Sequence, residues 1–399
     1  MNRRIWIAIL AAGLAAAKDP GTPWNLQELY KVPPVYSAPD TGEPGVRTLF
    51  IESVPYKGKA TRVFAYYGAP EVQEGAKVPA MVLIHGGGGT AFAEWVRLWN
   101  KRGYAAIAMD TVGTIPKRGE GNKLWNPDRE RHEHSGPAGW GDFNNVDLPP
   151  GDQWTYHAVA AAVKAHSLLR SFPEVDSKRT GVTGISWGGY LTSIVSGVDP
   201  RFRFAAPVYG CGFLGEDSAW LTQFEKLGKE RAARWLSLWD PSVYLAHARM
   251  PMLWVNGTND FAYPLPSWHK SLLLTKGRRT LAVRVRMKHS HPDGALPEDI
   301  HAYANAILRG GARPVRVLSM TRGGGEVAVR YKAAKPVVKA ELNFTKDSGP
   351  WQKRNWESLP VEAGRGRLAA QLPSDATAYY VNLFDADGLV SSTEPVLGP

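Results

Sequence analysis

The chain has 399 residues, of which 44% are hydrophobic, and it carries 48 Lys and Arg against 37 Asp and Glu. This length predicts two domains, or one large domain with an appendage, and the hydrophobic content excludes a disordered or collagen-like chain. Cys211 is the only cysteine in the sequence. A scaffold held together by intramolecular disulfides is therefore excluded.

The first seventeen residues have the pattern of a secretory signal peptide. Arg3 and Arg4 form a short basic start, and the apolar run Ile5–Ala17 that follows ends in three alanines. This run is shorter than the about 20 apolar residues that a transmembrane helix needs. We therefore expect a signal peptide over residues 1–17, cleavage near Ala17, export to the periplasm or the medium, and no stable membrane anchor afterwards.

The positive charge persists after such a cleavage, because removing two arginines leaves 46 basic residues against 37 acidic ones. Solubility alone explains this excess, and attraction to acidic polymers such as uronic-acid polysaccharides is the sharper alternative. Since the chain is expected to be exported and has no compact Lys/Arg-rich block, nucleic acid is not an expected partner.

An arm rich in Pro, Gly and Asp over residues 18–45 precedes alternating strand and helix patterns over residues 46–311. Several strand patterns are continuous apolar runs, as in strands buried on both faces. The alternation predicts a doubly wound, mostly parallel, eight-stranded α/β sheet. The expected strands are Arg47–Val54, Thr61–Tyr67, Ala80–His85, Tyr104–Asp110, Thr180–Ser186, Phe204–Tyr209, Pro251–Asn256 and Thr280–Met287. The expected helices are Ala91–Arg102, Gln153–Arg170, Gly188–Gly197, Pro266–Thr275 and Pro297–Leu308.

Three further regions depart from this alternation. The long polar segment Thr114–Gln153 is expected to shape a site, and the Trp-rich helical stretch Gly215–Arg249 to overhang the sheet as a partial lid. Residues 312–399 change to short alternating runs, which predict a C-terminal all-β sandwich domain. Its expected strands are Val315–Ser319, Glu326–Tyr331, Val337–Phe344, Arg367–Gln371 and Ala378–Phe384.

The segment Gly184–Gly188 reads Gly-Ile-Ser-Trp-Gly and fits the nucleophile elbow G-x-S-x-G. A predicted strand runs into the motif and a helix pattern follows it, so the two glycines would permit a strained turn that projects the hydroxyl of Ser186 above the sheet. The pentapeptide alone is a weak signal. Its context makes Ser186 the expected nucleophile.

A serine nucleophile needs a base and a carboxylate that orients the base, and with this elbow they follow in the order Asp or Glu, then His. Asp260 stands at the expected end of one late strand, and His289 and His291 follow the next one. We expect His291 to be the base because it lies closer to the start of the following helix, and His289 is the alternative.

The oxyanion of acyl transfer needs backbone donors, and the glycine-rich loop His85–Thr90 closes a predicted strand and matches the HGGG type. We assign the oxyanion hole to the N–H of Trp187 and that of Gly87 or Gly88. A phosphate-binding loop is the competing interpretation, but the Lys-Ser/Thr of a P-loop is missing, and no dinucleotide fingerprint opens a helix.

Other residues give weaker signals, and we expect neither a metal nor a cofactor. The His-Glu-His run at 132–134 lacks the helical H-E-x-x-H pattern and a cysteine pair, so structure or substrate contact is the favoured interpretation. Cys211 follows a strand other than that of the elbow and is expected to be a buried or pocket-lining thiol. Trp140 and Trp220 are expected to line the substrate pocket, where flat aromatic faces suit sugar rings.

With these motifs the chain resembles the α/β-hydrolase superfamily, and within it the exported acetyl xylan esterase and prolyl-oligopeptidase-like group of bacterial hydrolases. The resemblance covers about residues 24–310. The segments that carry it are Trp24–Tyr30, His85–Thr90, Asp176–Tyr190, Asp199–Phe202, Val255–Asp260 and Met287–His291.

The resemblance implies that Ser186 is the nucleophile, Asp260 the acid, and one histidine of the His289/His291 pair the base. It implies acetyl esters of plant or algal polysaccharide as the substrate class. The doubled histidine departs from the single histidine of most relatives. Residues 312–399 are similar to immunoglobulin-like or fibronectin-like modules of secreted hydrolases, and the resemblance carries no site residue there.

The leading hypothesis is therefore a secreted serine esterase acting on a small-molecule or polysaccharide ester. A prolyl-oligopeptidase-like peptidase with the same triad is the alternative, and the catalytic pattern starting near residue 46 leaves no room in this sequence for the N-terminal propeller usual there. A non-catalytic carbohydrate-binding protein on the same fold is the third hypothesis, because fold does not fix function.

Overall fold

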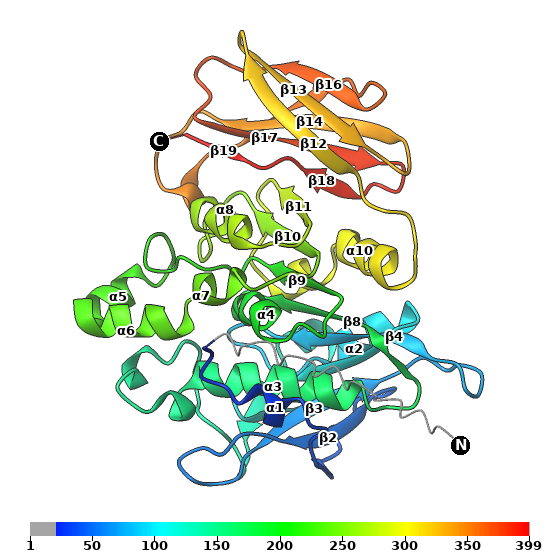
Figure 1. Cartoon of the computed structure of the whole chain (residues 1–399), viewed down its shortest axis with the longest axis vertical. Coiled ribbons are helices and arrows are strands. Elements are labelled where there is room, and N and C mark those ends of the chain that lie inside the picture. The colour runs from blue at the N-terminus through cyan, green and yellow to red at the C-terminus, as the bar shows by residue number, and fades with distance from the viewer. Residues whose placement is uncertain (1–20, 399) are drawn as a thin grey trace, which may run out of the picture.

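The computed structural model describes residues 21–398, so the predicted signal segment lies outside the described residues. Its central element is a nine-stranded sheet in the order β1-β2-β3-β5-β4-β8-β9-β10-β11 (Figure 1). The strands from β5 to β11 in this order are parallel, and β1, β2 and β3 join them antiparallel. The bounds are β1 Val35–Tyr36, β2 Arg47–Glu52, β3 Arg62–Gly68, β4 Val78–Ile84, β5 Ala105–Met109, β8 Val175–Ile185, β9 Phe204–Val208, β10 Met252–Gly257 and β11 Arg279–Arg284.

All eight strands expected in this sheet are present, and β1 in the N-terminal arm adds the ninth. The central strands are apolar throughout because helices cover both faces of the sheet; every residue of β4, for example, is buried. Helices α2 and α10 lie on one face, where the rings of Trp99 and His301 contact each other, and α1, α3, α4, α7 and α8 lie on the other. Their bounds are α1 Leu26–Leu29, α2 Ala93–Lys101, α3 Trp154–Leu169, α4 Trp187–Val198, α7 Pro241–Leu245, α8 Leu265–Leu274 and α10 Glu298–Leu308.

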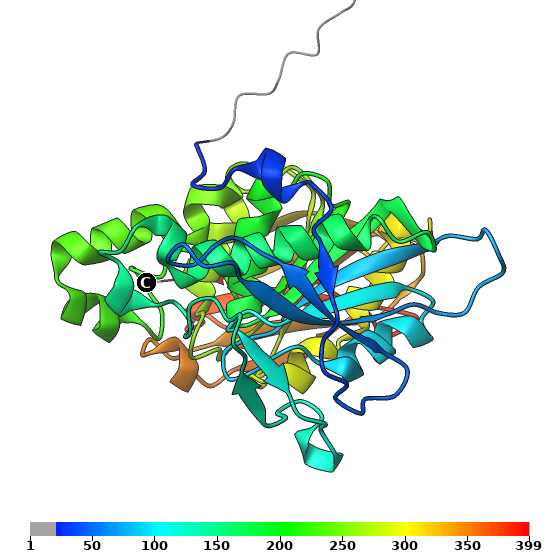
Figure 2. The ribbon, with the colours of Figure 1, turned by 90° about the horizontal axis from the view of Figure 1, so that it is seen from below.

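Two insertions pack against each other beside the carboxyl ends of the parallel strands. The polar segment 114–153 holds the hairpin β6–β7, which projects from the body in Figure 2, and the helical segment holds α5 and α6. Trp235 of α6 donates its indole N–H to the carbonyl of Gly141, and Trp239 donates to the amide oxygen of Gln153, both at 2.7 Å. The bounds are β6 Thr114–Pro116, η1 Gly121–Lys123, β7 Arg129–Arg131, η2 Phe143–Asn145, η3 Pro150–Asp152, α5 Leu221–Leu227 and α6 Lys229–Trp239.

The C-terminal residues form two antiparallel sheets, β12-β13-β16 and β15-β14-β17-β18, with β19 paired to β17. Both sheets contribute to a second hydrophobic cluster. The five strands expected here are present, whereas the short strands β15, β18 and β19 were not predicted. The likeness to immunoglobulin or fibronectin modules stays a prediction. The bounds are β12 Arg316–Gly323, β13 Glu326–Lys332, β14 Val337–Thr345, η4 Trp351–Lys353, β15 Glu357–Val361, β16 Arg367–Gln371, β17 Ala378–Asp385, β18 Val390–Ser392 and β19 Val396–Leu397.

The C-terminal sheets cover β11, the edge strand of the large sheet (Figure 1). The backbone N–H of Val283 in β11 donates to the hydroxyl of Ser392, and its carbonyl accepts from the amide of Asn382. Trp356 and Tyr380 add their rings to the main hydrophobic cluster at this junction. An open edge strand is a template for unwanted pairing, and here side chains of the C-terminal sheets form hydrogen bonds with it.

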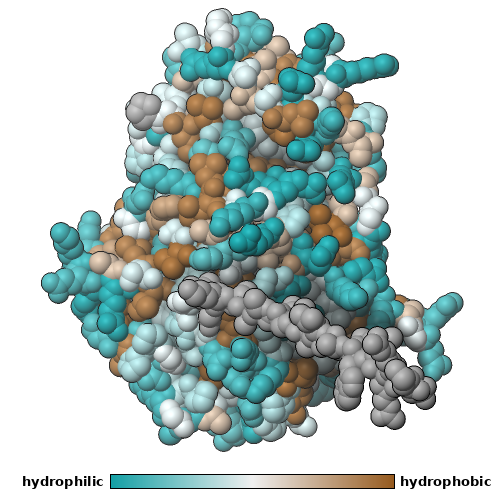
Figure 3. Space-filling model, viewed as in Figure 1, coloured by the Kyte–Doolittle hydropathy of each residue, from teal (hydrophilic) through white to brown (hydrophobic). Residues whose placement is uncertain are grey.

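The surface shows no single dominant apolar area on the face in Figure 3, where brown hydrophobic patches alternate with teal hydrophilic side chains. Among residues 21–398, no helix is long and apolar enough to cross a bilayer.

Candidate active site

Ser186 stands at a strained bend between the end of β8 and the start of α4. Its backbone has φ 58° and ψ −117°, outside the regions that residues with a side chain prefer. The flanking glycines are required by packing, since a Cβ on Gly184 would lie 2.2 Å from the carbonyl oxygen of Gly188, and one on Gly188 would lie 1.9 Å from that of Ile84. The sequence thus folds here as the elbow motif predicts.

Ser186, His289 and Asp260 form a continuous chain of hydrogen bonds. His289 Nε2 lies 2.8 Å from Ser186 Oγ, and His289 Nδ1 lies 2.6 Å from Asp260 Oδ2. Asp260 follows β10 and is buried, and its Oδ1 accepts the backbone N–H groups of Ala262 and Tyr263. With both carboxylate oxygens occupied, Asp260 fixes the orientation of the imidazole that faces Ser186.

The sequence favours His291 as the base, with His289 as the alternative, and it is His289 that contacts Ser186. His291 is the first residue of α9 (His291–Ala295), and its Nε2 accepts the backbone N–H of Gly86 at 3.0 Å. Burial, with the nearby His85 and His289, lowers the pKa of His291 to about 3, so it is a neutral acceptor. The prediction relies on the proximity of His291 to the helix. The ring at the helix start points toward the glycine loop, whereas His289 lies in the turn before the helix and faces Ser186.

The glycine-rich loop lies directly beside the elbow. A Cβ on Gly87 would lie 2.8 Å from Cδ1 of Trp187, so only glycine permits this approach. Trp187 opens α4, which places its backbone N–H at the helix N-terminus next to the nucleophile. Gly88 has φ +74°, and its carbonyl accepts from the guanidinium of Arg129. The N–H of Gly86 donates to His291, and that of Gly89 donates to the carbonyl of Gly86. The N–H groups of Gly87 and Gly88 are therefore the glycine donors of this loop that are left for an oxyanion.

Aromatic rings flank Trp187 at this edge of the sheet. Trp220 packs on Trp187 with 4.5 Å between ring centroids, and the half-buried Trp140 lies near Gly87 with Arg129 above its ring. Cys211 is fully buried, its Sγ lies 3.4 Å from the carbonyl oxygen of Gly212, and burial raises the pKa of the thiol. Trp140 and Trp220 thus border the site, while Cys211 is a buried thiol and does not line an open pocket.

The surroundings of His289 on its open side could not be predicted from the sequence. Phe261 is 57% exposed, and its ring lies 4.9 Å from that of His289. Asn259 donates to the carbonyl of Arg354, which follows η4 of the C-terminal sheets, at 2.7 Å. A surface cavity of about 320 Å³ lies beside His289. It is lined by the loop after β10, the turn after β11 and the segment around η4. In the sequence, only the aromatic residue directly after Asp260 could have pointed to this cavity.

A second group made of a hydroxyl, an imidazole and a carboxylate lies in the core. His166 Nδ1 is 2.7 Å from Asp199 Oδ2, and His166 Nε2 is 2.8 Å from Thr180 Oγ1. Both side chains of the His–Asp pair are completely buried, and Arg201 also pairs with Asp199. The ring of Phe202 stacks on His166 at 3.6 Å.

Residues 21–398 contain no group of three or more His, Cys, Asp or Glu side chains placed to hold a metal ion. In the 132–134 run, the ring of His132 packs against Phe50 at 4.8 Å.

Comparison with known proteins matches two family models to the chain. The acetyl xylan esterase (AXE1) model matches residues 24–218, and the prolyl oligopeptidase family model matches residues 152–305. An uncharacterized peptidase, YuxL, of Bacillus subtilis is 29% identical over 230 residues, 54% of this chain and 31% of that protein. Dipeptidyl-peptidase 5 of Aspergillus oryzae is 24% identical over 241 residues, 55% of this chain and 29% of that protein. The chain thus spans about a third of the length of these curated relatives.

Solved structures share the fold. The acetyl xylan esterase from Paenibacillus sp. R4 superposes with a TM-score of 0.55 at 20% identity, covering 71% of this chain and 92% of that one. Acetyl xylan esterase 1 from Thermoanaerobacterium gives a TM-score of 0.52 at 15% identity, covering 67% and 89%. The sheet order, the elbow and the two family matches agree, and together they support an α/β hydrolase of the acetyl xylan esterase and prolyl-oligopeptidase-like group.

Proposed function

We propose that this protein is a serine hydrolase that cleaves carboxylic esters, with acetyl esters on polysaccharides as its substrate class. The contact chain from Ser186 through His289 to Asp260 carries the proposal. A hydroxyl at a strained bend, an imidazole within 2.8 Å and a buried carboxylate behind it are the parts that acyl transfer needs.

The reaction runs in two halves. Ser186 Oγ attacks the ester carbonyl carbon while His289 Nε2 takes the hydroxyl proton, and the N–H groups of Trp187 and of Gly87 or Gly88 receive the negative oxygen. The tetrahedral intermediate expels the alcohol, which receives the proton from His289. Water then attacks the acyl-serine with His289 again as base, releasing the acid and restoring Ser186.

The leaving alcohol belongs on the open side of His289, because the histidine must deliver its proton there. That side holds the cavity of about 320 Å³ and the exposed ring of Phe261. A flat aromatic face at the mouth of a cavity suits a sugar ring, which supports a polysaccharide as the source of the alcohol. The match to the acetyl xylan esterase model supports acetate as the acyl group.

A prolyl-oligopeptidase-like peptidase is the second candidate function, favoured by the family match over residues 152–305. A peptidase would use the same three residues, so the site geometry is compatible with both an esterase and a peptidase. The two differ in leaving group, an alcohol against an amine. A carbohydrate-binding protein without turnover is the third.

Fluorophosphonate labelling with peptide mapping tests the mechanism, and three substrates test the class. We expect a covalent adduct on Ser186, its loss in Ser186→Ala, and hydrolysis of p-nitrophenyl acetate and acetylated xylan. Faster release from a prolyl p-nitroanilide peptide would favour the peptidase. Binding of xylan without labelling or turnover in the folded wild type would favour the binding protein.

We also propose that the chain is exported and cleaved near Ala17, because the basic start and apolar run of residues 1–17 have the signal-peptide pattern. Expression of the full chain in a Gram-negative host tests this. An N-terminus near Lys18 in the periplasmic fraction is expected, and an intact N-terminus in the cytoplasm would contradict it.

A further inference from the structure

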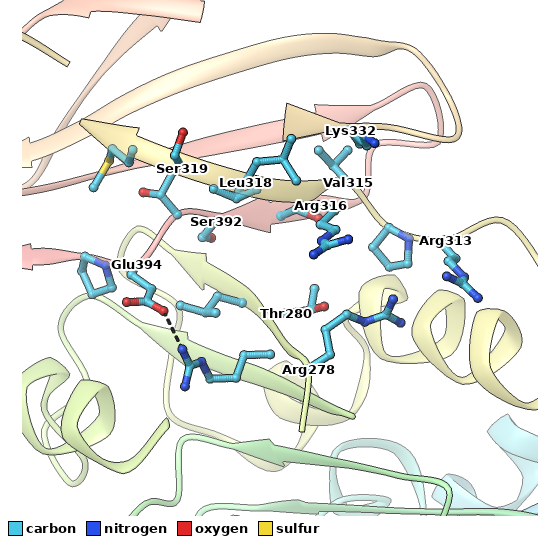
Figure 4. A pocket seen from close by; sticks show the side chains of 18 of the residues that line it. Arg278, Thr280, Arg313, Val315, Arg316, Leu318, Ser319, Lys332, Ser392 and Glu394 are labelled. Atoms are coloured by element: carbon cyan, nitrogen blue, oxygen red, sulfur yellow. Dashed lines mark hydrogen bonds and ion pairs between the residues drawn. The ribbon is translucent and has the colours of Figure 1, made fainter. Parts of the chain in front are cut away.

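A large hollow among the described residues lies away from Ser186, between the large sheet and the C-terminal sheets. It encloses about 1190 Å³ and is lined by the end of α8, the start of β11, the linker into β12, and β18 with the chain after it (Figure 4). We call this hollow the interdomain groove. It opens at the amino end of β11, whereas His289 follows the carboxyl end, so the length of the strand, about 20 Å, separates the two.

The groove gathers positive charge from both domains. One carboxylate, Glu394, faces these cations, and it already pairs with Arg279 and His269 at 3.3 and 3.7 Å. Figure 4 shows Arg278, Arg313 and Arg316 around one space. The lining cations are Lys276, Arg278, Arg279, Arg313, Arg316 and Lys332. Apart from Arg279, none of these six forms an ion pair with a carboxylate of residues 21–398.

Like charges brought together in a concave space repel one another, and this repulsion works against the folded state. A concave surface also focuses the field, which raises the local concentration of anions. The Arg279–Glu394 pair links the two sides of the groove, whereas the other five cations form no such pair within residues 21–398. The two sides are also held together by the hydrogen bonds of Val283 with Ser392 and Asn382 and by the buried rings of Trp356 and Tyr380. An anionic ligand would relieve the repulsion.

We propose that the interdomain groove binds an acidic polysaccharide, a glycan that carries carboxylates along its length. Sites for single-stranded nucleic acid combine cations with aromatic rings on which bases stack, and no Phe, Tyr or Trp is among the residues that line this groove. Hydroxyl and short apolar side chains such as Ser319, Thr280 and Leu318 share the lining with the cations. The proposal does not depend on the chemistry of Ser186, since the groove is a separate binding site that would hold the enzyme on an anionic polymer.

The test compares two double variants of the full chain with the same change in net charge. Arg278→Glu/Arg316→Glu reverses two charges in the groove. Lys59→Glu/Lys229→Glu reverses two exposed lysines that lie outside the groove and form no ion pair within residues 21–398. Affinity for polygalacturonate, for neutral xylan and for single-stranded DNA is measured by calorimetry at several salt concentrations, with hydrolysis of p-nitrophenyl acetate alongside.

We expect the wild type to bind polygalacturonate more tightly than xylan or DNA, with affinity falling as salt rises. The groove variant should lose roughly tenfold or more of this affinity while the control keeps it, and p-nitrophenyl acetate hydrolysis should stay within about twofold in both, because the groove is remote from Ser186. Equal loss in both variants, unchanged binding in the groove variant, or tighter binding of DNA would overturn the proposal.

A second measurement covers the case in which the groove variant does not fold. Phenylglyoxal modifies exposed guanidinium groups, and in the wild type polygalacturonate should protect Arg278 and Arg316 from it. Unprotected modification of both arginines at saturating polygalacturonate would also overturn the proposal. Loss of esterase activity with polygalacturonate binding intact would contradict the proposed function and leave the groove assignment standing.

Discussion

Two groups of hydroxyl, imidazole and carboxylate occur in this molecule with nearly the same distances. In one, Ser186 and Asp260 lie 2.8 and 2.6 Å from the two nitrogens of His289. In the other, Thr180 and Asp199 lie 2.8 and 2.7 Å from those of His166. Hydrogen-bond geometry alone therefore does not identify a catalytic site.

The two groups differ in access and in what surrounds the hydroxyl. His289 keeps 14% of its side chain exposed and borders an open cavity, whereas His166 is fully buried under Phe202. Ser186 also has a helix N-terminus and a glycine loop beside it to receive negative charge. The core group instead ties α3, β8 and the chain before β9 together. Access and oxyanion donors separate a reactive triad from a structural one.

Removing each hydroxyl should give the largest difference between the two groups. Ser186→Ala should lower kcat for p-nitrophenyl acetate by about 10⁴-fold or more, because the nucleophile is lost. Thr180→Val should leave kcat within about twofold and lower the free energy of unfolding by about 1–3 kcal/mol, because His166 loses a buried partner. Steady-state kinetics and urea unfolding check both. Comparable losses of kcat in the two variants would place chemistry in the core group.

Replacing the carboxylate of each group should separate a loss of activity from a loss of stability in the same way. Asp260→Asn should lower kcat by about 10⁴-fold, since the imidazole loses its orientation and tautomer. Asp199→Asn should cost roughly 3–5 kcal/mol of stability, because it removes a fully buried charge and leaves that of the partly buried Arg201 poorly compensated. Thermal unfolding alongside kinetics separates the effects, and a stable, inactive Asp199→Asn protein would contradict the structural role.

Replacing His291 should have an intermediate effect that acts through the glycine loop. His291→Ala removes the acceptor for the N–H of Gly86, so the loop loosens and kcat should fall by about 10-fold, with KM little changed. His291→Gln can accept the same N–H and should restore part of the rate. A loss as large as that of Ser186→Ala, without rescue by Gln, would return His291 to the role of base.

A substitution on the open side of His289 should have a smaller effect on kcat/KM, and the effect should depend on the substrate. Phe261→Ala should lower kcat/KM for acetylated xylan by about 5-fold, because a sugar ring loses its aromatic contact, and leave p-nitrophenyl acetate within about twofold. Equal changes for the two substrates would indicate that Phe261 acts on the position of His289 and not on the sugar.

The dependence of stability on pH should give the smallest effect of a single substitution. Burial lowers the pKa of His85 to about 4 and of His291 and His301 to about 3, so these rings are neutral when folded and take up protons on unfolding below about pH 6.5. Stability should therefore fall as the pH drops from 6.5 toward 4. Burial raises the pKa of Asp110 to about 6, which works in the opposite direction between about pH 4 and 6.

Urea midpoints at pH 7 and pH 5 measure this slope. His291→Gln should flatten it by up to about 1.4 kcal/mol per pH unit, the contribution of one proton. An unchanged slope would mean that His291 is already protonated in the folded protein at pH 5.

The large sheet could be predicted from sequence because its strands are continuous apolar runs set between helices. The short strands β1, β18 and β19 carry no such pattern, and pairing with neighbours defines them. Ser186 and Asp260 could be placed because each stands at the end of a strand. The choice between His289 and His291 could not, since one residue at the helix start decides where each ring points.

Contacts between segments far apart in the chain could not be predicted from the sequence either. Asn259 adjoins Asp260, but its partner Arg354 lies 95 positions later in a stretch with no motif. The Thr180–His166–Asp199 group was equally invisible, because a lone threonine and histidine inside apolar elements carry no recognisable pattern.

The hydroxyl of Ser392 and the amide of Asn382 close off the last strand of the hydrolase sheet. A chain shortened to end near residue 311 would expose β11 to solvent, together with the apolar surface that Trp356 and Tyr380 cover. Such a fragment would be expected to self-associate through strand addition. Residues 312–398 are thus expected to stabilise the large sheet, and a different module in their place would have to supply two polar side chains that pair with Val283.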